Sequence, residues 1–112
     1  MEIDAGFDSF FEEVKKILEG CDTSYIKEHI AIHVNVTDMG NRPFYIEIAD
    51  GDINVEPYGY YNNDTTINAD SQIIIAMITK QADLRNEYTL GRVGAYGNLY
   101  NLSILRDLIV SS

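Results

Sequence analysis

The two histidines, His29 and His33, have side chains that act as metal ligands or general bases near neutral pH. The spacing of four residues places them about 13 Å apart along an extended strand. That separation is too large for one shared metal ion, and no acid or hydroxyl completes a catalytic pattern with them. We therefore interpret both as solvated histidines on a polar strand face. Of three hypotheses for the function of this protein, an enzyme that uses His29 or His33 is the third, after the two non-catalytic functions given below.

Other reactive side chains give no catalytic pattern. The single cysteine, Cys21, follows the expected end of a helix and lies beside Asp22, a setting that does not favour a nucleophile. Glu47 is expected to face one of the strand histidines as a surface pair of small energetic value. The glycine-rich run at 91–97 is typical of a strand with close backbone approach, because a phosphate loop would follow a strand and open a helix. We expect no catalytic residue, no metal and no cofactor.

The composition limits the classes of function. The chain has 112 residues, 46% of them apolar, and its 18 acidic and 8 basic residues give a net charge of −10. This size predicts a single domain over residues 1–112. The negative charge argues against nucleic acid as a partner, because a phosphate backbone is bound through Lys and Arg. No apolar run approaches the roughly 20 residues that span a bilayer, so we expect no stable membrane insertion. The opening residues 1–4 do not resemble a signal peptide, and we expect a cytoplasmic location.

The first half of the chain predicts one helix followed by strands. Apolar residues recur at helical spacing over 7–19, and Gly20 is a plausible stop. The period then changes to two over 30–36 and again over 44–48, which is typical of strands with one buried face. Asp50-Gly51 is a strong hairpin signal. A third strand at 53–55, a loop at 57–63 and a short fourth strand at 65–67 complete this half.

The second half predicts two helices and one strand. Asp70 is a natural N-cap for a helix whose body, residues 73–78, is apolar on nearly every side. Such a helix must be buried on two sides or line a cavity. A short helical turn at 82–87, a fifth strand at 89–95 and a last helix after Gly97-Asn98 follow. Because strands and helices are segregated, the fold class is α+β, with helices on one face of a mixed, mostly antiparallel sheet and the other face open to water.

Four segments together resemble the sterol carrier protein-2 (SCP2) family of small lipid-binding domains. They are FFEEVKKIL (10–18), YIEIADG (45–51), DTTI (64–67) with the apolar helix after it, and GRVGAYGN (91–98) before the last helix. The set covers about residues 7–109 in the family's order. The resemblance implies a five-stranded α+β fold that holds a sterol, fatty acid, fatty acyl-CoA or phospholipid in an apolar tunnel, with neither cofactor nor catalytic residue. For this chain we expect a ligand of the fatty acid, fatty acyl-CoA, sterol or isoprenoid type. Carried over by position, the tunnel would be lined by the following residues: Ile32, Val34, Ile46, Ile73, Ile74, Met77, Ile78, Leu84, Leu99, Leu102 and Leu105.

Three features depart from the family pattern. The chain ends without the peroxisomal C-terminal tripeptide, its charge predicts repulsion from anionic membranes, and its loop at 57–63 is rich in tyrosine. The leading hypothesis is a non-catalytic carrier for a lipid or another elongated apolar molecule. The second hypothesis is a protein-interaction or dimerisation module that uses Tyr58, Tyr60 and Tyr61, or the exposed sheet face with Ala31 and Tyr45.

Overall fold

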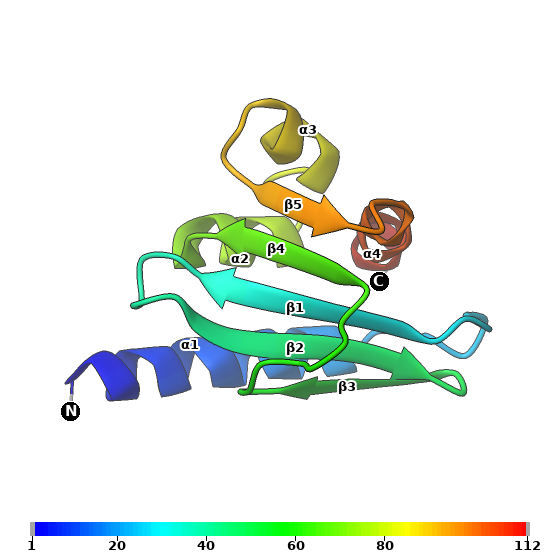
Figure 1. Cartoon of the computed structure of the whole chain (residues 1–112), viewed down its shortest axis with the longest axis horizontal. Coiled ribbons are helices and arrows are strands. Elements are labelled where there is room, and N and C mark those ends of the chain that lie inside the picture. Colours follow the sequence, from blue (N-terminus) through cyan, green and yellow to red (C-terminus); the bar gives the residue numbers. More distant parts are fainter. Residues whose placement is uncertain (1, 112) are drawn as a thin grey trace.

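A computed structural model describes residues 2–111, with side chains described from residue 6 to residue 110 (Figure 1). Over this range the chain forms four helices and five strands. Their order is α1 (Glu2–Glu19), β1 (Ile30–Val36), β2 (Arg42–Ala49), β3 (Asp52–Glu56), β4 (Thr65–Ala69), α2 (Ser71–Ile78), α3 (Leu84–Thr89), β5 (Gly94–Gly97) and α4 (Tyr100–Ser111).

The five strands form one mixed sheet in the order β3-β2-β1-β4-β5. Only the β1–β4 pair is parallel, and it is joined by the long excursion through β2 and β3. Asp50 and Gly51 have φ values of 53° and 80°, as a two-residue type I′ hairpin requires. This hairpin fixes the β2–β3 register, in which Ile48 pairs with Ile53. The predicted α+β class and the mostly antiparallel sheet are therefore confirmed.

The core lies between the helices and one face of the sheet. Figure 1 shows α1 and α2 behind the sheet and α3 and α4 at its β5 end. Three phenylalanines of α1, Phe7, Phe10 and Phe11, are buried there, and the rings of Phe10 and Phe11 contact Phe44 of β2. Alternate residues of the strands supply the facing layer, as the period of two predicts. The core thus joins α1 to the centre of the sheet.

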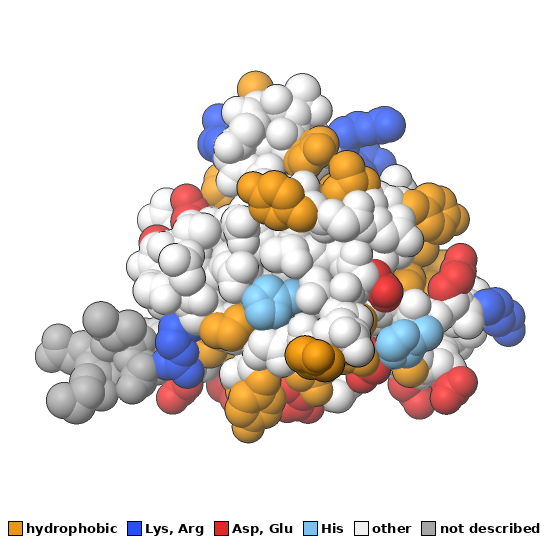
Figure 2. Space-filling view, in the orientation of Figure 1, with side chains coloured by type: hydrophobic (Ala, Val, Ile, Leu, Met, Phe, Trp, Pro, Cys, Tyr) orange, Lys and Arg blue, Asp and Glu red, His pale blue; other side chains and the backbone are white. Residues whose placement is uncertain are grey.

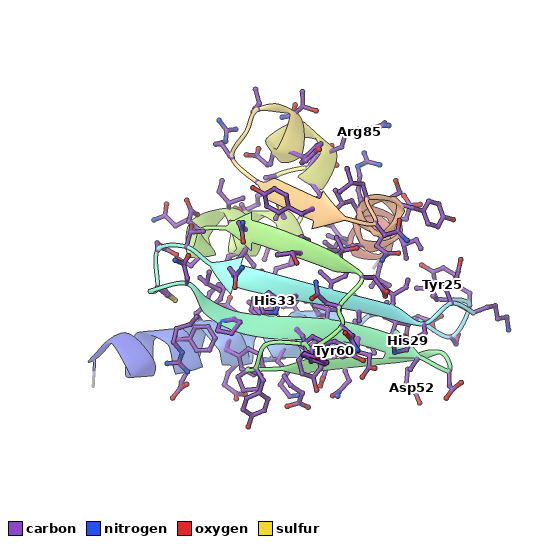
Figure 3. All side chains as sticks on the ribbon, in the orientation of Figure 1. Tyr25, His29, His33, Asp52, Tyr60 and Arg85 are labelled. Atoms are coloured by element: carbon purple, nitrogen blue, oxygen red, sulfur yellow. The ribbon has the colours of Figure 1, made fainter. Side chains whose placement is uncertain are left out.

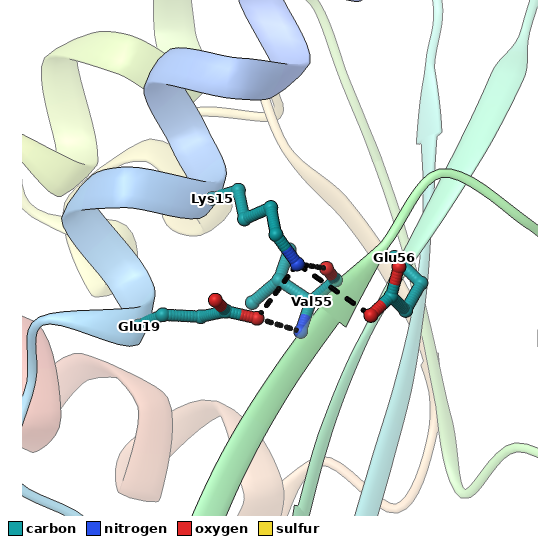
Figure 4. A network of polar contacts seen from close by, with 4 residues as sticks. All are labelled: Lys15, Glu19, Val55 and Glu56. Carbon is teal, nitrogen blue, oxygen red and sulfur yellow. Dashed lines mark hydrogen bonds and ion pairs between the residues drawn. The ribbon is translucent and has the colours of Figure 1, made fainter.

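Two side chains of α1 cover the outer edge of β3 (Figure 4). The Glu19 carboxylate accepts a 2.8 Å hydrogen bond from Val55 N, and Lys15 Nζ donates a 2.7 Å hydrogen bond to Val55 O. Lys15 also pairs with Glu19 at 3.0 Å and with Glu56 at 3.5 Å. An unpaired edge strand invites pairing with another chain, and these contacts satisfy its polar groups at Val55.

The predicted fifth strand at 89–95 is wrong in its position. Asp83 caps a short helix by accepting a hydrogen bond from Asn86 N, so residues 84–89 are α3. Buried Glu87 then holds the following turn, since its carbonyl accepts hydrogen bonds from Arg92 N and Val93 N. Only residues 94–97 remain for β5. Gly97 has a φ of +90° there, and a Cβ at this position would collide with the Asp64 carbonyl, so the expected close backbone approach is present.

The sheet face away from the helices is partly covered by the loop between β3 and β4, which crosses β2 and β1 in Figure 1. The ring of Tyr60 packs edge-on against Tyr45, with centroids 5.0 Å apart. Ala31 N donates to the Asp64 carboxylate, and Asp64 N donates to Ala31 O. Ala31 is only 1% exposed, so the expectation that it lies on an open face is wrong.

Candidate functional site

An apolar cavity lies between the helices and the inner face of the sheet. Its volume is about 30 Å³, and every residue that lines it is hydrophobic: Leu18, Val34, Phe44, Ile46, Ile67, Ile74, Met77, Ile78, Leu84, Leu105 and Ile109. Helix α2 begins at Ser71 because Asp70 accepts a 2.8 Å hydrogen bond from Ile73 N, as the sequence predicts for its cap. A space of this size holds about one water molecule.

Seven of the predicted tunnel residues line this cavity. They are Val34, Ile46, Ile74, Met77, Ile78, Leu84 and Leu105. Ile32 is buried in the core away from it, and Ile73 is half-buried on α2. The assignment of all the predicted tunnel residues to a ligand site stays a prediction.

Four lining residues were absent from the predicted set: Leu18, Phe44, Ile67 and Ile109. Each belongs to a periodic apolar pattern visible in the sequence. The patterns show that these side chains point inward, but which of them border the empty space depends on how α1 and α4 pack on the sheet.

A larger groove of about 360 Å³ lies on the surface between α3 and α4. Leu84, Arg85, Tyr88, Leu99, Leu102, Ser103, Arg106 and Asp107 line it. The groove contains the remaining predicted residues, Leu99 and Leu102, and Leu99 is 42% exposed because it precedes α4. Leu84 lines both the groove and the inner cavity, so it is the side chain that they share. Figure 2 shows hydrophobic and basic side chains together over this end of the molecule.

Two ion pairs hold α3 against its surroundings. Arg106 of α4 donates to the carboxylate of Asp83, the residue that also caps α3. Arg92 donates two hydrogen bonds, of 2.6 and 3.1 Å, to buried Glu87 and holds the pKa of that carboxyl below its ordinary value. Since Leu84 and Glu87 are the only buried residues of this six-residue helix, α3 contributes little apolar packing.

The histidines lie on the opposite face of the sheet and do not meet (Figure 3). His29 Nε2 lies 2.7 Å from Glu47, which confirms the expected surface pair. Tyr60 Oη donates a 2.7 Å hydrogen bond to the same carboxylate, and Tyr60 N donates to His33 Nδ1. Hydrogen bonds from His29 and Tyr60 hold the pKa of Glu47 below its ordinary value, while the bond to Glu47 raises the pKa of Tyr60 to about 12. His33 is only partly exposed and fixes the loop rather than standing free in solvent.

The three loop tyrosines have different surroundings. Tyr58 and Tyr61 are 64% and 89% exposed, whereas Tyr60 is half-buried by its contacts with Tyr45 and Glu47. Only the first two offer a free surface. In the described part of the chain, no helix is long and apolar enough to cross a bilayer. The same residues include no group of three His, Cys, Asp or Glu side chains that a metal ion would fit.

These features define an α+β protein in which helices enclose a small apolar cavity against one face of a mixed sheet. The same fold is found in sterol carrier protein-2 like-3 from Aedes aegypti, with a TM-score of 0.70 and 17% identity over 95% of this chain and 98% of that one. It is also found in Sterol Carrier Protein-2 from Aedes aegypti in complex with the C16 fatty acid palmitate, with a TM-score of 0.67 and 15% identity over 93% and 94%. The chain therefore has the SCP2 fold, and the resemblance seen in its sequence is confirmed at the level of structure.

A third similar structure is that of a larger enzyme. The stereoselective inverting sec-alkylsulfatase Pisa1 from Pseudomonas sp. matches 90% of this chain with a TM-score of 0.73 and 16% identity. This chain spans only 16% of that protein's length, so the likeness concerns one part of the sulfatase. No family model and no curated protein matches this sequence.

Proposed function

We propose that this protein is a non-catalytic, cytoplasmic carrier that binds a lipid or another elongated apolar ligand as one domain over residues 1–112. The observation that carries this proposal is the wholly apolar cavity between the sheet and the helices. Ligand sites are concave and lined mainly by hydrophobic side chains. The palmitate complex of an Aedes aegypti protein with the same fold supports the choice of ligand class.

The proposal includes an opening of the cavity, because small-molecule sites occupy about 300–1,000 Å³. The inner cavity has about 30 Å³ and the groove between α3 and α4 about 360 Å³. Displacement of Leu84, which both spaces share, would join them into one channel. Helix α3 is suited to this movement because it is short and buries few side chains.

The direct test is to look for the ligand itself. The full chain is expressed, purified without detergent, extracted with organic solvent and analysed by mass spectrometry. We expect a lipid in stoichiometric amount, or saturable uptake of one by the extracted and refolded protein. A folded protein that neither carries nor takes up any lipid would contradict the proposal.

The variant Met77→Trp tests the location of the site. Met77 lines the cavity, and the larger indole fills it, at a cost of about 1–3 kcal/mol in stability for overpacking. We expect lipid affinity to fall at least tenfold while circular dichroism retains the wild-type signal.

The matched control is Ile75→Trp, on the half-buried side of the same helix away from the cavity. It is expected to keep lipid affinity. Equal affinity in Met77→Trp and wild type would show that Met77 does not border the ligand. If Met77→Trp does not fold, Met77→Phe gives the same comparison with less strain.

A second candidate function is self-association through the loop between β3 and β4. The exposure of Tyr58 and Tyr61 favours it, because tyrosine is enriched at interfaces and both rings stand free. We expect light scattering to detect a dimer that the double variant Tyr58→Ser, Tyr61→Ser abolishes. A monomer at all concentrations would rule this function out.

A further inference from the structure

The groove between α3 and α4 carries no net negative charge in a strongly acidic chain. Its lining includes two basic residues, Arg85 and Arg106, and one acidic residue, Asp107. Asp83 pairs with Arg106, so these four side chains together sum to zero. The whole chain has a net charge of −10. A concave surface without net negative charge repels anions less than a strongly acidic surface does. The groove is therefore better suited to an anionic head group than the surface around it.

Arg85 is the cation in the groove that has no partner. No carboxylate of the described residues forms an ion pair with it, and Figure 3 shows its side chain projecting from α3 toward solvent. Arg106 is already bound to Asp83. A guanidinium group presents parallel N–H donors that match the two oxygens of a carboxylate. Arg85 can therefore accept such a group without breaking an existing ion pair.

Apolar surface lies directly beside this charge. Leu84 precedes Arg85 in α3, Leu99 lines the same groove from just before α4, and Leu102 lines it from the first turn of α4. Leu84 also borders the inner cavity. A molecule with its charged end at Arg85 would therefore place an attached alkyl chain against Leu84, at the boundary of the buried space.

We propose that Arg85, assisted by Arg106, forms a carboxylate-binding subsite in the α3–α4 groove, and that the ligand is a single-chain fatty acid whose tail passes Leu84 into the inner cavity. This inference rests on the proposed function, because it places the head group of a ligand whose tail the cavity holds. It also specifies the class of ligand, since a neutral sterol or alcohol would leave the guanidinium unpaired. Asp107 lies in the same groove and opposes the anion, so Arg85 carries most of the recognition.

The test compares two ligands of equal chain length, dodecanoate and 1-dodecanol, with the delipidated full chain. Binding is measured by titration calorimetry at slightly alkaline pH, where the acid is ionised. The variants are Arg85→Gln, Arg85→Lys and, as a control of equal charge change, Lys16→Gln on the exposed side of α1. Arg106→Gln is a poorer choice because it also frees Asp83, the cap of α3.

We expect wild type to prefer the acid to the alcohol. Arg85→Gln should weaken dodecanoate binding about three- to tenfold and reduce the ratio of the two affinities, and Arg85→Lys should restore part of the loss. Lys16→Gln should leave the binding of both ligands as in wild type. Equal loss of dodecanoate affinity in Arg85→Gln and Lys16→Gln, or equal binding of acid and alcohol by wild type, would overturn the subsite while leaving the lipid-binding function intact. Failure of both ligands to bind would overturn the proposed function itself.

Discussion

At the scale of single residues, Tyr60 anchors the loop between β3 and β4 to the sheet. Its hydroxyl donates to Glu47, which also contacts His29, and its backbone N–H donates to His33. Tyr60, which the sequence suggests as a contact for other proteins, therefore makes its contacts within its own fold. The neighbouring Tyr61, with no such contact and 89% exposure, remains available.

The variant Tyr60→Phe tests this anchor through its pH dependence. Loss of the hydrogen bond to Glu47 should lower the free energy of unfolding by about 1 kcal/mol near neutral pH. The pKa of Glu47 is lowered in the folded state, so its contribution is present above its ordinary pKa and lost as the pH falls through the folded value. The pKa of Tyr60 is raised from 10.0 to about 12, so the contribution of this phenol is present below pH 10 and lost as the pH rises toward 12.

Urea unfolding of Tyr60→Phe and wild type across the pH range gives the measurement. The difference in the free energy of unfolding between the two proteins should be largest near neutral pH. It should shrink in acid, where Glu47 is protonated, and again as the pH rises toward 12, where Tyr60 loses its proton. Tyr61→Phe is the matched control and should show no difference. A loss that does not vary with pH would show that packing against Tyr45, and not the hydroxyl, holds the loop.

At the scale of elements, α1 acts as a cover for the edge of the sheet as well as a wall of the core. Glu19 and Lys15 bind the N–H and the carbonyl of Val55 in β3. The opposite end of the sheet is different, because β5 has only four residues and is preceded by the short helix α3, which buries only Leu84 and Glu87. The stable edge and the loosely packed edge thus lie on opposite sides of the molecule, and the groove between α3 and α4 lies at the second.

The variant Glu19→Ala tests the cover. It leaves Val55 N–H without its acceptor and Lys15 without its nearer carboxylate partner, and we expect the free energy of unfolding to fall by about 1 kcal/mol. The exposed edge should also increase self-association, measured by sedimentation at rising protein concentration. The control is Glu12→Ala, an exposed glutamate on the same helix that removes the same charge. Equal behaviour of the two variants would contradict a role for Glu19 at the edge.

At the scale of the whole molecule, the proposed channel forms only when α3 moves and Leu84 is displaced. The core between α1 and the central strands is continuous, whereas α3 is attached through Leu84, Glu87 and the Asp83–Arg106 pair. Ligand binding should therefore order α3 more than any central strand, because segments with little buried surface open first.

Hydrogen exchange measures this difference. Amides of α3 should exchange faster than those of β1 in the ligand-free protein, and dodecanoate should slow the exchange of α3 while β1 stays unchanged. Protection confined to the loop at 57–63 would instead place the ligand on the other face of the sheet. Uniform protection of the whole chain would contradict a local opening at α3.

The sequence by itself determined the parts of this protein that local patterns control. The alternation in β1 and β2, the Asp50-Gly51 turn and the Asp70 cap each depend on a few neighbouring residues, and each is found in the structure where the pattern places it. The helical stripe of α1 likewise fixed which of its side chains enter the core. Seven of the eleven predicted tunnel residues line the cavity because an inward-facing apolar residue is recognisable from its period.

Only the tertiary structure decided where β5 begins, which apolar residues border empty space, and which charges remain unpaired. The start of β5 depends on the Asp83 cap and on the turn that buried Glu87 holds, which compete with the strand preference of residues 89–93. Leu99 and Leu102, which the sequence placed in the tunnel, instead line the surface groove because of the way α4 packs against α3. Asp83 pairs with Arg106 across 23 residues of sequence, and no ion pair among the described residues involves Arg85. Contacts of this kind arise from packing between distant segments, and no local pattern records them.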